Sequence, residues 1–218
     1  MITTTVPTRH EVIGLELDGV MDVPERPRGV VLFVCVRSDP MDARIARTLN
    51  ERRIATVAVN LLTRAEQEFN RGADVRFDAT ALGARVIALI DDIATRGPTT
   101  GLRGGLFGSG SAAAGAIVAA VARPGWARAV FSCSGRPDLA GELVRLVRCP
   151  TLLVVGEVDA AVRVVNEQAG PEFPRTARVV RVPGASLLHG EPPALVSELA
   201  RDWFFLRLCG RARRSAGR

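Results

Sequence analysis

The stretch from Gly104 to Gly115 constrains the fold more than any other part of this chain. Leu102–Phe107 has the apolar and small residues of a buried strand, and Ala112–Ala122 has the small residues of a closely packed helix. Only glycines and serines, at positions 108–111, separate the two segments, so the backbone must turn very sharply there. A buried strand that passes at once into a helix is the basic unit of α/β folds.

Segments of the same two kinds alternate along the rest of the chain. We expect an opening antiparallel hairpin, with strands His10–Leu17 and Gly19–Val23 joined by a turn at Asp18-Gly19. Residues 61–78 are polar and irregular, and we expect them to cross over the strand ends. The whole pattern predicts a single α/β domain over residues 1–208, with a mainly parallel sheet, the hairpin as its antiparallel edge and helices on both faces. The other expected strands are Val30–Val36, Ile54–Asn60, Ala127–Ser132, Thr151–Val155 and Arg178–Val182, and the other expected helices are Asp42–Arg53, 78–94, Asp138–Leu146, Val162–Gln168 and Ala194–Leu208.

Arginine is the source of the positive side-chain charge, because the chain has no lysine. The net charge is +6. Residues 209–218 hold Arg211, Arg213, Arg214 and Arg218, and we interpret them as a basic, solubilising tail outside the domain. Contact of the tail with nucleic acid or an anionic surface is the alternative. Since aromatic residues make up 5% of the chain and tyrosine is absent, we do not expect a nucleic-acid partner.

The cysteines point to a reducing compartment. Cys35, Cys133, Cys149 and Cys209 lie far apart, form no C-x-x-C pair and lie mostly in apolar runs, which predicts reduced core residues and neither a disulfide framework nor a metal site. The N-terminal residues have no basic and apolar regions of a signal peptide, and no apolar run reaches the ~18 residues of a membrane helix. We therefore expect a cytoplasmic protein with no membrane contact.

Two nucleotide-binding patterns fit the glycine-rich turn in part. Gly108-x-Gly110-x-x-Ala113 satisfies the dinucleotide fingerprint, but that fingerprint needs an acidic residue about 20 positions later, and no carboxylate lies between 113 and 135. Gly105-x4-Gly110 matches the glycines of a phosphate-binding loop, but Ser111 stands where that loop has its lysine. Both patterns lack a principal charged group, so we expect no cofactor.

Five segments of the sequence add to the evidence from the turn, and two of them, Gly135–Leu139 and Pro150–Asp159, are fairly specific. The five are Asp22-Val23-Pro24 through Gly29-Val30-Val31-Leu32-Phe33, Gly105-Leu106-Phe107-Gly108, Gly135-Arg136-Pro137-Asp138-Leu139-Ala140, the run Pro150–Asp159, and Val182-Pro183-Gly184-Ala185. Together they resemble the dienelactone-hydrolase-like branch of the α/β-hydrolase family, in the small form that also occurs fused to phosphoribosyltransferases. The resemblance spans roughly Gly19 to Leu208 and implies an α/β-hydrolase fold. For the family it implies hydrolysis of a small carboxyl ester or lactone by a nucleophile, a histidine and an acid.

The resemblance also implies where the catalytic residues should stand. In the family's nucleophile elbow, G-x-S-x-G, the serine falls on Gly110 and the second glycine falls on Ala112. Asp159, just after the strand Thr151–Val155, matches the acid. The histidine normally follows the Val-Pro-Gly-Ala stretch by two residues and falls on Leu187, whereas the histidine present is His189.

The first buried parallel strand departs from the family as well, since Cys35 and Val36 stand where a His-Gly turn would begin the oxyanion loop. Taken together, these departures predict an α/β-hydrolase fold with an eroded triad and little or no hydrolase activity. The expected role is then binding of a small ester, lactone or anionic ligand, or interaction with a protein partner.

A shift of the elbow frame by one residue gives the alternative. Ser111 would then be the nucleophile, His189 the base and Asp159 the orienting acid of an active serine hydrolase. A helix N-cap role for Ser109 or Ser111 would explain the same serines without catalysis. The sequence leaves both interpretations open.

Overall fold

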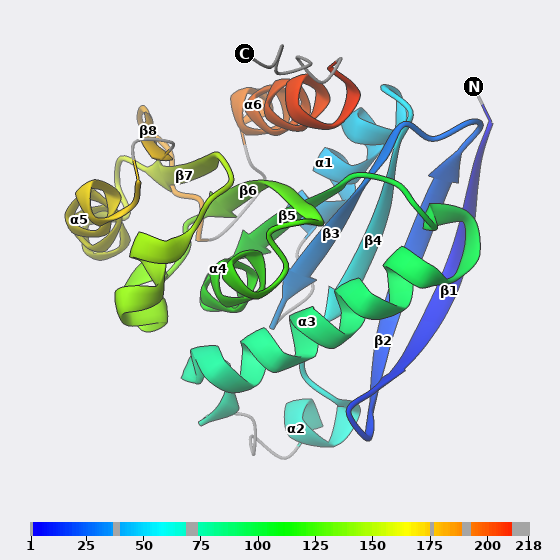
Figure 1. The fold of residues 1–218 in the computed structure, drawn as a ribbon. Helices are drawn as coiled ribbons and strands as arrows, with labels where there is room; N and C mark the ends of the chain where they lie inside the picture. The colour runs from blue at the N-terminus through cyan, green and yellow to red at the C-terminus, as the bar shows by residue number, and fades with distance from the viewer. Residues whose placement is uncertain (1, 37–39, 69–73, 175–176, 189–192, 211–218) are drawn as a thin grey trace, which may run out of the picture.

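The computed structural model describes residues 2–36, 40–68, 74–174, 177–188 and 193–210. In these parts of the chain one eight-stranded sheet has the order β1-β2-β4-β3-β5-β6-β7-β8 (Figure 1). The strands from β3 to β8 are parallel, and β1 and β2 form the antiparallel edge, as the sequence predicted. The strands are β1 Thr3–Val12, β2 Leu15–Pro24, β3 Gly29–Cys35, β4 Ile54–Asn60, β5 Gly104–Ser109, β6 Ala127–Cys133, β7 Thr151–Gly156 and β8 Ala177–Val182.

The opening hairpin is longer than expected, and its turn lies elsewhere. The chain turns at Ile13-Gly14, where both residues have positive φ, +47° and +73°, as a tight hairpin turn requires. The predicted turn at Asp18-Gly19 was wrong: both residues lie within β2, paired with Arg9 and Thr8. A glycine is needed at position 19 because the neighbouring strand lies very close: a Cβ there would be 2.7 Å from the Ala58 carbonyl oxygen.

Helices cover both faces of the sheet, as predicted (Figure 1). Helices α1 (Pro40–Asn50) and α6 (Ala194–Phe204) pack together on one face, and α3 (Ala79–Thr95) and α4 (Ala112–Ala122) pack together on the other. The remaining helical segments are α2 Arg64–Glu68, α5 Ala160–Ala169, the short 3₁₀ segments Val75–Phe77, Gly97–Thr99, Pro137–Leu146 and Gly170–Glu172, and a π-helical turn Phe205–Cys209 that continues α6.

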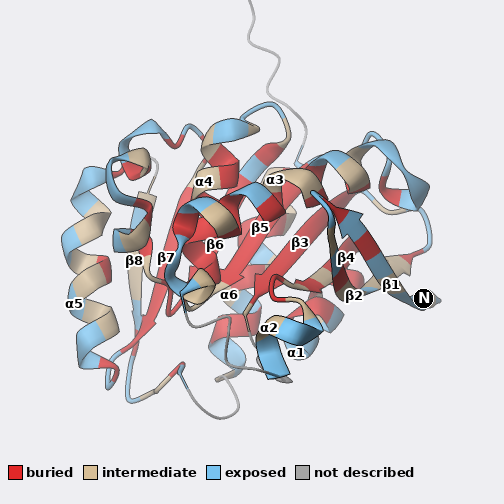
Figure 2. Cartoon of the chain, turned by 90° about the horizontal axis from the view of Figure 1, so that it is seen from below, coloured by how far each residue is buried: buried red, intermediate tan, exposed pale blue. Residues whose placement is uncertain are grey.

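Each face of the sheet has its own apolar core, and the middle strands are buried from both sides (Figure 2). Under α1 and α6 a row of rings runs across the sheet from Phe33 through Phe107 and Phe131 to Phe204, with centroids 4.6, 5.3 and 6.2 Å apart. Burying such rings contributes most of the stability of a core of this kind. The strands are almost wholly apolar because both of their faces are covered.

The segment 61–78 is more ordered than expected where it is described. Glu66 on α2 reaches Arg85 on α3, which is 6% exposed, and the two side chains form hydrogen bonds of 2.7 and 2.8 Å. Arg85 also donates to the Leu61 carbonyl, so it fixes the chain just after β4. These bonds lower the pKa of Glu66 to about 2, mainly through the hydrogen bond from Arg85.

The final helical segment continues beyond the end of α6. The π-helical turn carries the chain to Cys209, and residues 211–218, which hold most of the predicted basic tail, lie outside the described residues. In the described part of the chain no helix is both long enough and apolar enough to cross a membrane.

Candidate functional site

The chain passes from β5 into α4 through Gly110. The φ of Gly110 is +54°, in the left-handed region that other residues rarely adopt, and a Cβ placed there would meet no atom within 4 Å. The Gly110 N–H donates to the Cys133 carbonyl at 3.2 Å, and its own carbonyl accepts from the Arg136 N–H at 3.1 Å. The apex of the elbow is therefore a glycine that is held by its backbone and has open room for a side chain.

Small residues beside the apex let the strand and the helix approach each other. A Cβ on Gly108 would lie 2.6 Å from the Cα of Ala113, and a Cβ on Gly135 would lie 2.6 Å from the Cβ of Ala113. Ala112 is fully buried. The sharp strand-to-helix turn expected from the sequence is thus present, with Gly108 and Ala112 two residues on either side of Gly110.

Ser111 follows the apex with right-handed helical angles, φ −70° and ψ −24°, and its side chain makes no capping hydrogen bond. Only 6% of the residue is exposed. The backbone N–H groups of Ser111 and Ala112 donate to no group in the described part of the chain, as is usual in the first turn of a helix. Ser111 therefore lies at the start of α4, one residue past the apex.

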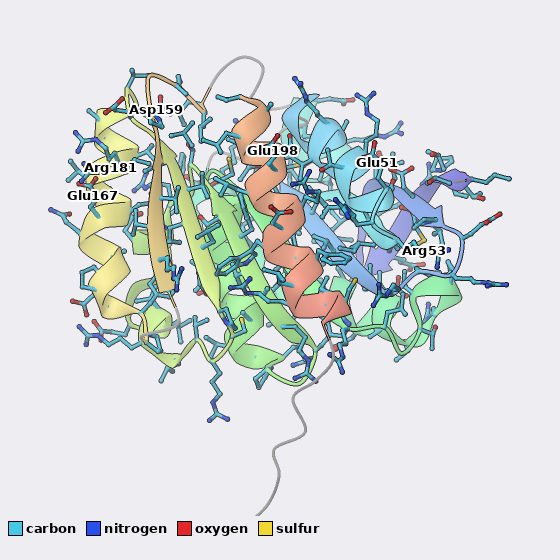
Figure 3. The ribbon with its side chains drawn as sticks, turned by 90° about the horizontal axis from the view of Figure 1, so that it is seen from above. Glu51, Arg53, Asp159, Glu167, Arg181 and Glu198 are labelled. Carbon is cyan, nitrogen blue, oxygen red and sulfur yellow. The ribbon has the colours of Figure 1, made fainter. Side chains whose placement is uncertain are left out.

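Asp159 lies three residues after the end of β7 and immediately before α5 (Figure 3). It is 8% exposed, and both of its carboxylate oxygens accept hydrogen bonds: Oδ1 from the Ser186 hydroxyl at 2.6 Å and Oδ2 from the Leu187 N–H at 2.7 Å. Gly156 makes this approach possible, because a Cβ there would lie 2.5 Å from Asp159 Oδ2. The acid predicted from the resemblance is thus a buried carboxylate that holds the loop after β8.

That loop is fastened to the end of β7 by two further bonds. The Val158 N–H donates to the Ala185 carbonyl at 3.2 Å, and the Gly184 N–H donates to the Glu157 carboxylate at 2.8 Å. The structure thereby brings position 187 to Asp159, where the family resemblance expects its histidine. The side chain there is Leu187, which is 5% exposed and belongs to the core under α6.

His189 lies outside the described residues. Of the three residues in the shifted triad, the structure therefore places Ser111 and Asp159 and leaves the position of the base undescribed.

The end of β3 is the place where the family resemblance expects the oxyanion loop to begin. The Cys35 carbonyl accepts from the Leu61 N–H at 2.8 Å, and its thiol points to the Val59 carbonyl at 3.7 Å. Cys35 is buried and Val36 is half-buried, and residues 37–39, where an oxyanion loop would continue, lie outside the described residues. Neither residue has the glycine freedom of a His-Gly turn.

Three serines that the sequence analysis did not single out also lie at the ends of these strands. Ser132 and Ser134 are buried, and neither hydroxyl has a hydrogen-bond partner among the described residues. Ser134 has a φ of +44°, an uncommon conformation for a residue other than glycine. Ser186 occupies one oxygen of Asp159. The sequence alone could not identify these serines as part of the site, because serines are common beside the ends of buried strands.

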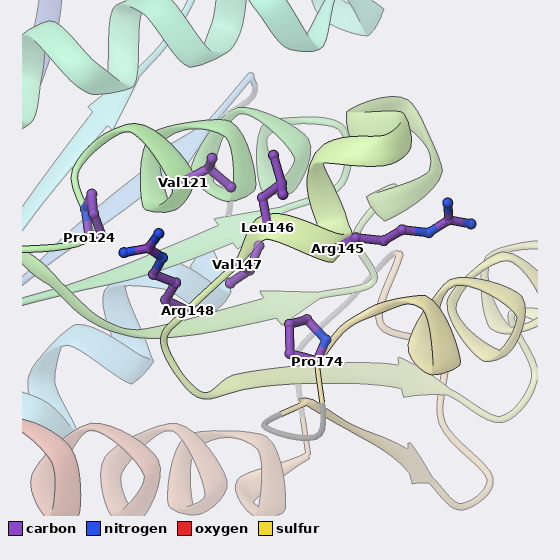
Figure 4. Close-up of a pocket in the computed structure, with 7 residues that line it drawn as sticks. All are labelled: Val121, Pro124, Arg145, Leu146, Val147, Arg148 and Pro174. Carbon is purple, nitrogen blue, oxygen red and sulfur yellow. The ribbon is translucent and has the colours of Figure 1, made fainter.

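Two hollows lie beside other parts of the sheet. One, of about 530 Å³, lies at the end of β3 and is lined in part by Cys35, Ala46 and Asn60. The other, of about 520 Å³, lies near the start of β7 between Val121, Arg148 and Pro174 (Figure 4). The described residues contain no cluster of histidine, cysteine and acidic side chains that could hold a metal ion.

The sheet order, the elbow after β5 and the acid after β7 define an α/β-hydrolase fold. A dienelactone hydrolase from Anabaena variabilis is 34% identical to this chain with a TM-score of 0.88, over 94% of this chain and 99% of that one. Est1E from Butyrivibrio proteoclasticus is 13% identical with a TM-score of 0.77, over 93% and 99% of the two chains, and shows the fold alone. No family model matches the chain.

Proteins from two strains of Mycobacterium tuberculosis are each 40% identical to this chain over 198 residues, which is 88% of this chain. Both are named "Putative phosphoribosyl transferase", and the match spans 44% of their length. The likeness to the Anabaena enzyme covers nearly all of both chains, and this chain therefore belongs to the dienelactone hydrolase family.

Proposed function

We propose that this chain is a dienelactone hydrolase family member with an eroded triad, which binds a small ester, lactone or organic anion and hydrolyses it little or not at all. The observation that carries the proposal is Gly110. A hydrolase of this class attacks its substrate with a hydroxyl or thiol held at the elbow apex. Gly110 has the backbone conformation of that apex and no side chain.

The position of the base supports the same proposal. Asp159 is oriented towards position 187, but Leu187 offers it only a backbone N–H and cannot accept a proton from a nucleophile. Loss of the nucleophile alone leaves only the weak rate enhancement that comes from binding and from an oxyanion hole. With the base position also apolar, we expect no turnover above that residual level.

The elbow still has groups that suit a ligand oxygen. The free N–H groups of Ser111 and Ala112 lie at the start of α4, where the helix dipole favours a negative charge. The missing side chain at Gly110 leaves room next to them. A carboxylate, or the carbonyl oxygen of an ester or lactone, fits this chemistry.

Two assays on the whole chain test the proposal. We expect no hydrolysis of small aryl esters or lactones above buffer, and a rise in melting temperature with a panel of small carboxylates, since a ligand that binds only the folded state stabilises it. Esterase activity that disappears in Ser111→Ala would instead establish the shifted triad of Ser111, His189 and Asp159. No stabilisation by any carboxylate, ester or lactone would remove the binding role.

We also propose that the protein is cytoplasmic. No disulfide joins the four cysteines, which all lie among the described residues, and three of them are buried. Burial raises the pKa of Cys149 to about 11, which keeps that thiol protonated and unreactive. Thiols of this kind fit a reducing compartment.

A further inference from the structure

The edge of the sheet opposite the elbow carries a row of arginines. The strands β4, β3, β5, β6, β7 and β8 are neighbours in that order and are parallel, so their first residues lie along one edge. An arginine lies within three residues of the start of every one of them. We call this set the arginine row: Arg53, Arg28, Arg103, Arg128, Arg148 and Arg178.

The spacing of the row follows from the sheet. Neighbouring strands lie about 4.8 Å apart, so the backbones that start these six strands span roughly 24 Å along this edge. All members of the row are exposed. Figure 4 shows Arg148 beside Pro124 at the hollow near the start of β7.

The charges of the row are not neutralised within the molecule. No member forms an ion pair with a carboxylate in the parts of the chain that the structure describes. Arginines elsewhere on the surface do: Arg9 pairs with Glu16, Arg64 with Asp18 and Arg181 with Glu167. Glu25 and Glu51 precede β3 and β4, so the excess positive charge is greatest from β5 to β8.

The C-terminal turn adds to the same surface. Arg28 donates to the Cys209 carbonyl at 3.0 Å, and Arg103 donates to the Gly210 carbonyl at 3.4 Å. Arg207 lies over the ring of Trp203, 3.2 Å from its centroid. Burial lowers the pKa of Arg207, and the nearby charge of Arg178 lowers it further, so like charges are held close together here.

These contacts fix guanidinium groups by carbonyls and rings while leaving their charge available. A compact anion would engage one or two members of the row. An extended series of cations along one edge of the sheet instead suits a linear polyanion, and guanidinium groups pair well with phosphates.

We propose that the arginine row binds the phosphate backbone of nucleic acid without reading its sequence. Arginines lie over two of the aromatic rings near the row, Trp203 and Phe205, and the third ring, Trp126, is half-buried against the backbone of Gly104. Because guanidinium groups pair well with phosphates, we assign the contact to phosphates and not to stacked bases. The low aromatic content of the sequence argued against a nucleic-acid partner, and the row itself is assembled by the strand order, which sequence spacing does not show.

The test is binding of the full-length chain to a fluorescent DNA duplex of about 20 base pairs, by anisotropy at several salt concentrations. The variant Arg103→Gln/Arg128→Gln/Arg148→Gln removes three neighbouring members of the row. The control Arg9→Gln/Arg64→Gln/Arg181→Gln removes the same charge from elsewhere. We expect the row variant to bind more than about tenfold more weakly and to lose about 2 to 3 from the slope of log K against log salt, with the control within about twofold of wild type.

A further variant separates charge from folding. Arg103→Lys/Arg128→Lys/Arg148→Lys keeps the charges, so it should bind DNA within about threefold of wild type, because phosphate contacts of this kind are mainly electrostatic. Equal weakening in the row and control variants, loss of binding in the lysine variant, or no DNA binding by wild type would overturn the proposal. Equally tight binding of polyglutamate or of vesicles containing phosphatidylserine would overturn the assignment to nucleic acid.

Discussion

The carboxylate of Asp159 accepts a hydrogen bond from the backbone N–H of Leu187 at 2.7 Å, while the Leu187 side chain lies in the core under α6. The loop after β8 is thus still held where a catalytic acid would orient a histidine, but the side chain at that place is apolar. We propose that this arrangement, together with Gly110 at the elbow apex, is the framework of a hydrolase site without its nucleophile and its base.

The role of Asp159 is then structural, and removing its carboxylate should cost stability. In Asp159→Ala the Leu187 N–H and the Ser186 hydroxyl lose their acceptor, which should lower the free energy of unfolding by about 2 to 3 kcal/mol. Ser186→Ala removes one of the two bonds and should cost about 1 kcal/mol. Urea denaturation of the two variants measures both. A wild-type stability for Asp159→Ala would show that the loop does not depend on this carboxylate.

The two glycines of the elbow should respond differently to alanine. Gly108→Ala places a methyl group 2.6 Å from the backbone of Ala113, so strand and helix must move apart, and we expect a loss of at least about 2 kcal/mol. In Gly110→Ala the new methyl group meets no atom within 4 Å, so the only cost is that of the left-handed backbone conformation. We expect this variant to lose about 1 kcal/mol of stability. Thermal unfolding of both variants should rank them in that order. The reverse order would contradict the packing around the apex.

Cysteine scanning locates the apex directly. Gly110→Cys presents a thiol with no atom within 4 Å of its Cβ, whereas Ser111→Cys places it at a position that is 6% exposed. We expect a thiol reagent to modify the first variant at least about tenfold faster, because access of the reagent governs such reactions. Wild type under native conditions gives the background from Cys209. Faster modification of Ser111→Cys would place the accessible position one residue later and favour the shifted frame.

The sequence predicted the fold well because its main determinants are local. Ile54–Asn60 and Ala112–Ala122 were predicted with the bounds that the structure shows, since a fully apolar strand and a helix of small residues have distinct patterns. The helix expected over 78–94 begins at Ala79, where Asp78 accepts from the N–H groups of Thr80 and Ala81. The hairpin turn was misplaced because Asp18-Gly19 has the residue types of a turn. Gly19 is required instead by the close approach of the neighbouring strand.

The site was less accessible to prediction because it depends on contacts between distant segments. The resemblance pointed to Gly110, at the turn between β5 and α4, and to Asp159, in the short loop between β7 and α5, and the catalytic role of these positions stays a prediction. It could not show that Ser186 occupies one oxygen of Asp159, 27 residues away in sequence. The arginine row was equally hidden, because its members are scattered along the chain and meet only through the order of the strands.

The ion pair between Glu66 and Arg85 makes stability depend on acid. The pKa of Glu66 is lowered from 4.5 to about 2 in the folded state, so its contribution is fully present above about pH 5 and is lost as the pH falls towards 2. We expect this group to account for about 2 to 3 kcal/mol of the stability lost between pH 6 and pH 2. Glu66→Gln should flatten the acid side of the stability curve by that amount.

Glu172, in the exposed pair with Arg145, is the matched control for this experiment. Glu172→Gln should leave the acid dependence nearly unchanged, because exposed ion pairs contribute little to stability. An unchanged acid dependence in Glu66→Gln would show that the buried pair between α2 and α3 does not stabilise the fold.

The most direct test of the central claim is treatment of the wild-type chain with a fluorophosphonate, followed by intact mass and peptide mapping. If the elbow holds no working nucleophile, the mass stays that of the unmodified chain, and both Ser111→Ala and Ser109→Ala behave like wild type. A stoichiometric adduct on Ser111 that is absent from Ser111→Ala would show that this chain is an active serine hydrolase and would contradict the account.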